Sequence, residues 1–451
     1  MAGCLGEVGN FAGQSLFTGG ATLGEAQVTM PRSSDGIRLA KLAVLSWLVA
    51  GAIPTSSAGD SPSPRIAAIV TEYRHNSHAD VIVSRLLTTN TLDGKGDVFP
   101  LKLVSLYTDQ KPENDISRRL AAKYQIPIKP SIAETLTLGT KTLAVDGVLL
   151  VAEHGSYPFS ATGNHQYPKR RLWEETVKVF RESGRVVPVF IDKHLSDNWE
   201  DAKTVYDTAR ELKIPLMAGS SVPGAWRYPP ADVSAGARIS EIVAFTYGST
   251  DAYGFHGLEA LQSLAEQRQG GETGVRSVQC LTGDAAWKAF DDHRFDPEIY
   301  DAALSRLPRH EHGEPLDRKA VAEPKVMIIE YEDGLRAFLL EMNGAADTWT
   351  AAWRYHDGRR IESTQFWLQE GRPAAHFGVM LEGITKMMLS GKPASPVERT
   401  LLTSGVLDAL LQSETLGGKP VVTPYLRVSY RSGWRWKQPP PPPPMRPWAE
   451  E

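Results

Sequence analysis

Two apolar runs decide the fold of this chain: Asp146-Gly-Val-Leu-Leu-Val-Ala-Glu-His154 and Val186-Val-Pro-Val-Phe-Ile-Asp-Lys-His194. Each is nearly continuous in Val, Leu and Ile, which is typical of a strand buried on both faces of a parallel sheet. Between the two runs, Trp173, Val177 and Phe180 fall on one helical stripe. Strand, helix and strand in this order predict a βαβ unit.

The same alternation continues on both sides of this unit. We expect further strands at 66–70, 101–107 and 214–218, and helices at 79–87, 115–124, 131–138, 169–183 and 199–212. The helix at 131–138 opens with Ser131 and carries Glu134 three residues later, which is the capping-box spacing. Residues 65–222 are therefore predicted to form a Rossmann-like α/β domain, a doubly wound parallel sheet with helices on both faces.

The pattern changes after the proline-rich stretch that ends at Pro230. We expect strands at 238–247, 277–281, 325–332, 335–343 and 348–355, and helices at 253–267, 297–305, 374–390 and 396–413. The last three strands look like an antiparallel meander, with Asp333-Gly334 as one turn and Asp357-Gly358 as the next. Residues 223–430 are thus predicted to form an α+β domain with a largely antiparallel open sheet.

Both ends of the chain differ from the rest. Within the leader 1–64, residues 30–58 combine basic residues, an apolar run from Leu42 to Ile53 and small residues up to Ala58. This is the pattern of a secretory signal peptide, and the run is too short for a comfortable membrane span. The alternative is a buried or disordered leader on a cytoplasmic protein. The tail 431–451 contains prolines from Pro439 to Pro444 and is expected to be stiff polyproline II.

Composition excludes several classes of function. The chain has 451 residues, a net charge of −4 and no basic face or tail, so nothing suggests a nucleic-acid partner. The apolar fraction of 41% and the charged fraction of 23% are ordinary for a soluble protein with real cores. Only Cys4 and Cys280 occur, which rules out a disulfide framework and a four-cysteine zinc site.

The chemistry is expected beyond the carboxyl ends of the parallel strands, where loops and helix N-termini of a doubly wound sheet converge. The residues that follow the strands are Glu72, Tyr73, Arg74, His75, Asn76, Ser77, His78, Asp109, Glu153, His154, Asp192, Lys193, His194 and the stretch 219–221. So many acids and histidines at one edge, together with a lysine, predict a functional crevice.

The first of these turns departs from the usual dinucleotide site. A glycine-rich turn lets the backbone approach the pyrophosphate closely, whereas the turn from Thr71 to His78 has no glycine. Ser77 is able to cap the following helix beside a phosphate, with Tyr73, Arg74 and His75 adding contacts or charge, but Glu72 opposes an anion. Asp109 stands where a Rossmann domain holds the adenosine ribose, and a solvated turn aspartate is the alternative.

The order of these motifs resembles the glucose–fructose oxidoreductase/inositol dehydrogenase (Gfo/Idh/MocA) family. That family has a Glu-Lys-Pro triplet after a strand of its first domain, and Asp192-Lys193-His194 falls on it. It also has a D-x-G-x-H element that opens a helix of its second domain. Gly254 and His256 match this element, with Asp251 one residue early. The helix from Pro396 resembles the family's last long helix, so the resemblance spans residues 66–430.

The resemblance implies NAD or NADP in the first domain and a sugar or polyol against the second. In that scheme Lys193 and His256, with Asp192 beside them, orient the substrate hydroxyl and relay its proton while hydride moves to or from the nicotinamide. Glu153 and His154 stand where the family has a turn beside the nicotinamide. Family analogy also implies self-association through the second sheet.

Other interpretations of the same residues remain open. Lys193 alternatively has a purely structural role in an ion pair with Asp192 or Glu153. His256 alternatively caps a helix or packs in the core. If the first turn has lost dinucleotide affinity, the strand ends offer N and O ligands for a divalent metal on a sugar-modifying enzyme: His75, His78, Glu153, His154, Asp192 and His194. A non-catalytic ligand-binding protein on this fold is a third interpretation.

Overall fold

The computed structural model describes residues 62–445. The predicted signal peptide at 30–58 and Cys4 lie outside these residues. Among the helices that the model describes, none is long and apolar enough to cross a membrane.

The first part of the described chain alternates strands and helices as the sequence predicts. Its elements are β1 (Arg65–Val70), α1 (His78–Leu87), β2 (Lys102–Thr108), α2 (Ser117–Tyr124), α3 (Ile132–Thr137), β3 (Gly147–Val151), α4 (Lys169–Ser183), β4 (Val189–Asp192), α5 (Trp199–Leu212) and β5 (Leu216–Gly219). The strands form one parallel sheet in the order β2-β1-β3-β4-β5. Ser131 caps α3 by accepting from the Glu134 backbone N–H, which confirms the capping signal.

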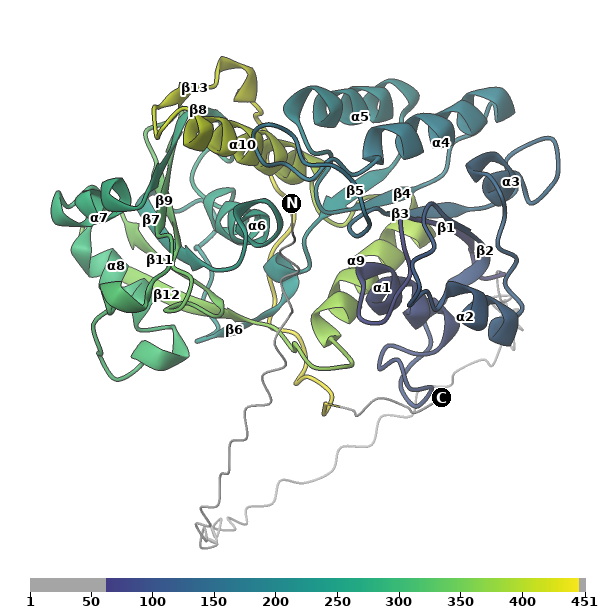
Figure 1. The fold of residues 1–451 in the computed structure, drawn as a ribbon, viewed down its shortest axis with the longest axis horizontal. Coiled ribbons are helices and arrows are strands. Elements are labelled where there is room, and N and C mark those ends of the chain that lie inside the picture. The colour runs from purple at the N-terminus through teal and green to yellow at the C-terminus, as the bar shows by residue number, and fades with distance from the viewer. Residues whose placement is uncertain (1–61, 446–451) are drawn as a thin grey trace, which may run out of the picture. The chain divides into compact units, whose positions relative to one another are not determined.

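Helices cover both faces of this sheet, as Figure 1 shows. On one face, Trp173 and Phe180 of α4 join the core beneath β1, β3 and β4. On the other face, Val81 of α1 packs into a second core with Ile66 and Val70. β1, β3 and β4 are buried on both sides because nearly every position in them is apolar. The predicted doubly wound domain is thus present.

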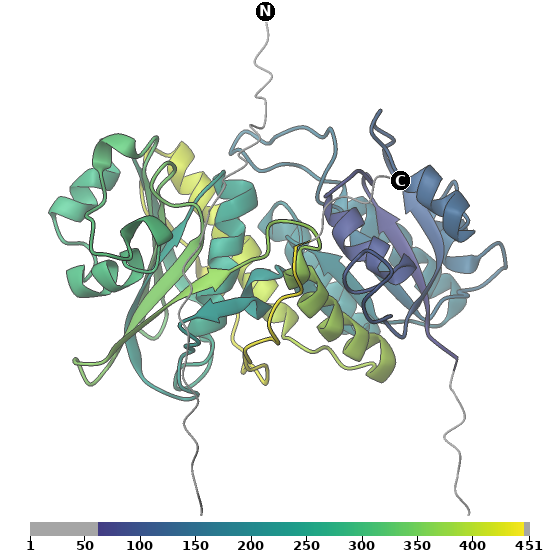
Figure 2. The same ribbon diagram turned by 90° about the horizontal axis from the view of Figure 1, so that it is seen from below.

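The second part contains a larger mixed sheet. Its elements are η1 (Val222–Gly224), β6 (Trp226–Tyr228), β7 (Ile239–Thr246), η2 (Thr250–Gly254), α6 (Phe255–Ala265), β8 (Val275–Thr282), α7 (Asp284–Asp291), α8 (Pro297–Leu304), η3 (Pro308–His310), η4 (Arg318–Ala320), β9 (Lys325–Tyr331), β10 (Arg336–Glu341), β11 (Trp349–Tyr355), β12 (Ile361–Trp367), α9 (Ala375–Ser390), α10 (Val397–Thr415), β13 (Val421–Val422) and η5 (Pro424–Leu426). The order of the strands is β13-β8-β9-β10-β7-β11-β12-β6. Helices α6 and α10 pack on one face and α7 and α8 on the other, and both layers can be followed in Figure 2.

The predicted meander is correct only for its hairpins. β9 and β10 pair across Asp333-Gly334, and β11 and β12 pair across Asp357-Gly358. However, β10 does not pair with β11, because β7 lies between them and runs parallel to β10. Sequence neighbours were expected to be sheet neighbours, and the long segment from β7 to β9 allows β7 to insert instead.

Two late helices pack on the first sheet, and one of them reaches the second. Phe377, Leu381 and Ile384 of α9 pack in the core of the first sheet although they follow the second sheet in sequence. α10 contacts α6 and β8, and it also contacts α5 and β5. α10 therefore holds the first sheet next to the second sheet.

The proline run packs against the protein instead of extending from it. The indole N–H of Trp226 donates to Pro440 O at 2.7 Å, and the amide of Gln369 donates to Pro443 O at 2.5 Å. The Gln438 side chain accepts from the Arg227 backbone N–H at 3.0 Å. Residues 438–445, which we call the C-terminal strap, thus run beside β6 and the segment that leads into α9.

Candidate functional site

A cavity of about 370 Å³ lies where the carboxyl edge of the first sheet meets α6, β11 and the start of α9. Its wall includes Glu153, His154 and Lys193 from the ends of β3 and β4, His78 from the start of α1, and His256 from α6. The strand-end residues therefore converge as expected, and His256 joins them from the second domain. The size is that of a small-molecule site.

Lys193 is buried and is held by two partners. Its ammonium Nζ lies 2.7 Å from Glu153 Oε1 and donates to Ala252 O at 3.1 Å. Ala252 belongs to the π-helical turn η2, which opens α6. The ion pair with Glu153 that the sequence left as an alternative is present, and it coexists with a place in the cavity wall. Two of the three ammonium protons have partners, so one is left for a ligand.

A second buried lysine holds the turn that presents Lys193. Lys169 Nζ donates to the carbonyls of Asp192 at 3.2 Å and His194 at 3.0 Å, and also to that of Lys193. On the opposite side of the turn, His194 Nε2 lies 2.8 Å from Asp251 O of η2. The backbone of residues 192–194 is thereby fixed between α4 and α6.

His78 and Asp192 form a buried pair at the cavity. His78 Nδ1 lies 2.6 Å from Asp192 Oδ2, and the Asp192 side chain is 2% exposed. Because a carboxylate only accepts, Nδ1 donates the proton in this hydrogen bond, so in the neutral form of the ring the lone pair lies on Nε2. Asp192 thus orients His78, and its predicted role beside Lys193 stays a prediction.

The remaining histidines of the wall are neutral. Burial, together with the charge of Lys193 and other neighbouring groups, holds the pKa of His256 well below its usual range. Burial and the neighbouring His78 do the same to the pKa of His154. Burial lowers the pKa of His376 to about 3. At neutral pH the cavity thus offers imidazoles as hydrogen-bond donors and acceptors instead of as cations.

One side of the cavity is aromatic. The rings of Tyr253 and Trp349 are stacked with centroids 6.0 Å apart and planes within 9° of each other. Trp349 also meets the His256 ring edge to face at 5.5 Å. A flat apolar wall opposite polar hydrogen-bonding groups suits a ring-shaped, hydroxyl-rich molecule.

The first turn does not fit a dinucleotide pyrophosphate. Several of its amides already have acceptors: the Arg74 and Asp80 N–H groups donate to Ser77 Oγ, and the Asn76 N–H donates to Asp80 Oδ2 at 3.0 Å. Ser77 caps α1 as expected, and these amides are thereby not available to a phosphate. The pairing of Arg74 with Glu72, at 2.6 Å, neutralises the nearby cation, and the buried carboxylate of Asp80 pairs with Arg372 at 2.8 Å.

Other residues predicted to bind the cofactor lie outside the wall of this cavity. Tyr73 has no exposed surface, and its hydroxyl lies 2.7 Å from Ser84 Oγ inside the core. His75 lies outside the cavity wall, 3.6 Å from Asp80 Oδ2, and burial lowers its pKa to about 4. Of the predicted cofactor residues, Glu153 and His154 do line the cavity.

Asp109, the predicted ribose ligand, is bound by other side chains of the protein. Asp109 accepts hydrogen bonds from the hydroxyls of Tyr107 and Tyr157, each at 2.8 Å, and from Arg171 at 2.5 Å. Burial alone would raise the pKa of Asp109, but these donors outweigh it and lower the pKa. The side-chain amide of Gln110 donates to Ser156 O and accepts from the Ser156 backbone N–H. The loop after β3 is thus bound to the end of β2 beside Asp109.

Residues 62–445 contain no ligand set for the divalent metal that the sequence left as an alternative. There, no group of three or more His, Cys, Asp and Glu side chains is arranged to hold a metal ion. The candidate ligands are divided among other partners, with His78 on Asp192, Glu153 on Lys193 and His194 on a carbonyl.

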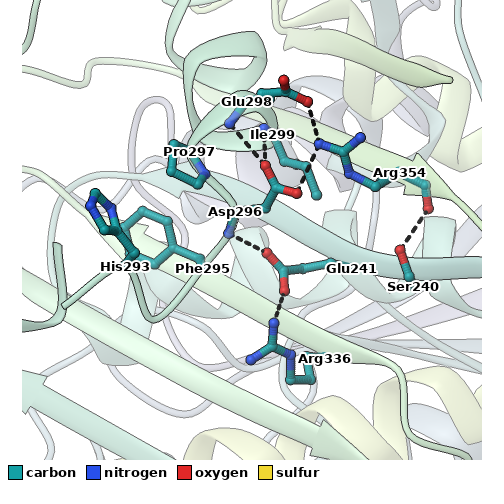
Figure 3. A pocket seen from close by; sticks show the side chains of 10 residues that line it. All are labelled: Ser240, Glu241, His293, Phe295, Asp296, Pro297, Glu298, Ile299, Arg336 and Arg354. Carbon is teal, nitrogen blue, oxygen red and sulfur yellow. Dashed lines mark hydrogen bonds and ion pairs between the residues drawn. The ribbon is translucent and has the colours of Figure 1, made fainter. Parts of the chain in front are cut away.

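A second cavity lies at the opposite end of β7 and is less suited to a ligand. Figure 3 shows its charged side chains bound to each other: Arg354 reaches Asp296 at 2.8 Å and Glu298 at 2.6 Å, and Glu241 pairs with Arg336. This network fastens the loop before α8 to the sheet.

Sequence reasoning did not assign two residues that matter here, Ser220 and Trp349. The sequence places Ser220 only in the stretch 219–221 that follows a predicted strand, and Trp349 only in the strand predicted at 348–355. A strand-end serine is a weak signal, and the packing of β11 beside α6 is visible only in three dimensions.

Comparison with known proteins finds solved structures with a similar fold. The sequence matches no protein-family model and no curated protein. GenD2 from gentamicin A biosynthesis, solved in complex with NAD, is similar in structure at 14% identity, with a TM-score of 0.50 over 82% of this chain and 99% of that chain. Myo-inositol 2-dehydrogenase from Lactobacillus plantarum (12% identity, TM-score 0.48, 80% and 99% covered) and apo scyllo-inositol dehydrogenase from Lactobacillus casei (12%, 0.48, 80% and 98%) are further neighbours. The fold of this chain is thus similar to that of GenD2, at low sequence identity.

Proposed function

We propose that this chain is an acid–base enzyme that removes a proton from a carbon next to the carbonyl of a small carbohydrate-like molecule. The observation that carries the proposal is the His78–Asp192 pair, which faces the same cavity as Lys193 and His256. A base and two donors at one cavity are the parts that such a reaction needs. The aromatic wall of Tyr253 and Trp349 supports a sugar-like substrate.

The proposed step moves electrons only within the substrate. His78 Nε2 takes the proton, the C–H electron pair forms a C=C bond, and the carbonyl π pair moves onto oxygen. Lys193 and His256 stabilise the negative charge on that oxygen. Asp192 stabilises the His78 imidazolium. The imidazolium then gives its proton to the former carbonyl carbon, while the proton of the adjacent hydroxyl moves to the former carbonyl oxygen; alternatively it gives its proton to a hydroxyl on the next carbon, which leaves as water while the carbonyl re-forms. Isomerisation and elimination of a sugar are the reactions within reach.

A second candidate is hydride transfer between NAD(P) and a sugar or polyol, which the family resemblance implies. The convergence of Lys193 and His256 on one cavity supports it, and the structurally similar GenD2 binds NAD. The used amides of the first turn and the occupied Asp109 count against it. Export directed by residues 30–58 would also favour a reaction that needs no nicotinamide, because such cofactors are scarce outside the cytoplasm.

The two candidates are separated by one experiment. The purified full chain is incubated in D2O with a panel of aldoses, ketoses and keto-sugars, with and without NAD⁺ or NADP⁺. Deuterium entering a carbon-bound position without dinucleotide, followed by mass spectrometry and NMR, supports the first candidate. Formation of NADH or NADPH without such exchange would replace it by the second. Saturable sugar binding without either reaction would identify a ligand-binding protein.

A further inference from the structure

Ser220 contacts the ring of His256 from outside the cavity. Its Oγ lies 2.6 Å from His256 Nδ1, and it follows the last strand of the first sheet, whereas His256 is on α6 of the second part. The contact occupies one ring nitrogen of His256 and leaves Nε2 as the nitrogen available to a molecule in the cavity. Which of the two nitrogens carries the proton decides what His256 is able to do there.

The surroundings of Ser220 decide the direction of this hydrogen bond. Ser220 Oγ accepts from the Val222 backbone N–H at 3.0 Å. The hydroxyl proton then needs an acceptor, and His256 Nδ1 is the acceptor within reach. An acceptor Nδ1 belongs to the neutral ring with its proton on Nε2.

We propose that Ser220 is a positioning residue that holds His256 with its proton on Nε2, so that His256 donates a hydrogen bond to the substrate oxygen instead of acting as a base. This inference rests on the proposed function for its chemical meaning. It assigns opposite roles to two histidines of the cavity: His78 acts through the lone pair of its Nε2, and His256 presents an N–H.

The fold keeps Ser220 in place. Its backbone N–H donates to Glu259 Oε2 at 3.3 Å, and Glu259 is anchored by the hydroxyl of Thr403 at 2.6 Å. Gly219 has a φ of +115°, and a Cβ there would lie 2.5 Å from both Glu259 Oε2 and Thr400 Oγ1. Glycine is therefore required for the strand to end with Ser220 in this position.

The depressed pKa of His256 is consistent with this arrangement. A doubly protonated ring would have to donate from Nδ1 as well, and the hydroxyl proton of Ser220 would then lose His256 as its acceptor. Burial and the charge of Lys193 oppose that cation. The donor on Nε2 therefore persists through neutral pH, where His78 must be unprotonated to act as a base.

The tautomer can be read in the free protein. Full-length protein labelled with ¹⁵N-histidine is studied by long-range ¹H–¹⁵N NMR at neutral pH, with the His256 signals assigned by their loss in His256→Gln. We expect a protonated-type shift for Nε2 and an unprotonated-type shift for Nδ1. The reverse assignment would overturn the proposal. In Ser220→Ala both nitrogens should move toward averaged shifts, whereas Ser220→Thr, which keeps the hydroxyl, and the distant surface variant Ser390→Ala should retain the pattern.

Activity gives a second, separable readout. Ser220→Ala should lower kcat for substrate deuterium exchange by about tenfold or more, with recovery in Ser220→Thr and with the pH profile of the His78 base unchanged. An unaltered kcat in a Ser220→Ala protein whose His256 shifts have changed would remove Ser220 from the positioning role. If no substrate undergoes exchange, the proposed function fails, and the NMR result still decides the tautomer.

Discussion

His78 and Asp192 are 114 residues apart in sequence, yet His78 Nδ1 lies 2.6 Å from Asp192 Oδ2. Parallel pairing of β1, β3 and β4 brings the start of α1 and the end of β4 to the same edge of the sheet. The acid determines which nitrogen of His78 is protonated and stabilises the imidazolium that forms when the ring takes a proton. This is the relationship from which we derive a base at the cavity.

His78→Gln should lower the rate of substrate deuterium exchange by about 10²–10⁴-fold, because a general base contributes that range. Sugar binding, measured by calorimetry, should change little. Asp192→Asn should also lower the rate of deuterium exchange, since an amide N–H facing Nδ1 favours the tautomer with its proton on Nε2. His75→Gln is the matched control, because His75 is three residues away and does not line the cavity. Equal activity of His78→Gln and His75→Gln would contradict the role of His78.

Lys193→Met should reduce both activity and stability. It leaves the carboxylate of Glu153 buried with only Lys169, at 3.7 Å, as a cationic neighbour. Breaking a buried pair by removing one partner costs about 3–5 kcal/mol in free energy of unfolding. The double variant Lys193→Met/Glu153→Gln should regain much of that stability in urea unfolding while activity stays low. Recovery of activity in the double variant would show that Lys193 has only a structural role.

The parallel sheet was predictable because its strands are continuously apolar and its helices carry clear caps and stripes. The mixed sheet was predictable in its hairpins but not in its order, since no local signal shows that β7 inserts between β10 and β11. At the site, strand-end position sufficed to gather Glu153, His154 and Lys193. The pairing of His78 with Asp192, and the bonds that Tyr157 and Arg171 make to Asp109, depend on side-chain geometry that spacing does not encode.

Two aspartates should affect stability with opposite pH dependence. Burial raises the pKa of Asp251 from 3.8 to about 6. Such a group stabilises the folded state below its unfolded pKa, and this contribution is lost as pH rises through about 6. Two pKa units correspond to about 3 kcal/mol. Asp251→Asn should therefore gain stability relative to the wild type between pH 4 and pH 7, measured by urea unfolding at each pH.

Asp109 provides the matched control for that measurement. Its folded pKa is lowered by Arg171, Tyr157 and Tyr107, so its contribution is present above the unfolded pKa and is lost as pH falls through the folded pKa. Asp109→Asn should be less stable than the wild type at pH 7, and the difference should shrink only toward strongly acidic pH. Parallel pH profiles for the two variants would show that burial does not control the titration of Asp251.

Removal of the C-terminal strap should loosen the wall of the cavity. A chain that ends at Lys437 loses the acceptors of Trp226 and Gln369, and Gln369 is next to the cavity residues Leu368 and Glu370. We expect faster amide hydrogen exchange in residues 368–374 and a weaker substrate affinity, with the first sheet unaffected. A chain that ends at Met445 keeps these contacts and is the control. Unchanged exchange in 368–374 would show that the strap is not needed to hold this segment.

The full-length protein should not bind NAD⁺ or NADP⁺ with an affinity useful to a dehydrogenase. Native mass spectrometry and fluorescence titration should show no saturable binding up to about 1 mM, the upper end of ordinary KM values. The physical reason is that Ser77 Oγ and Asp80 Oδ2 already accept from the amides of the first turn. Tyr157→Phe/Arg171→Ala removes two donors from Asp109 but leaves that turn unchanged, so the double variant should not bind either. Micromolar binding by the wild type that disappears in Asp109→Ala would show that the chain opens to admit a dinucleotide, and hydride transfer would then replace the reaction proposed above.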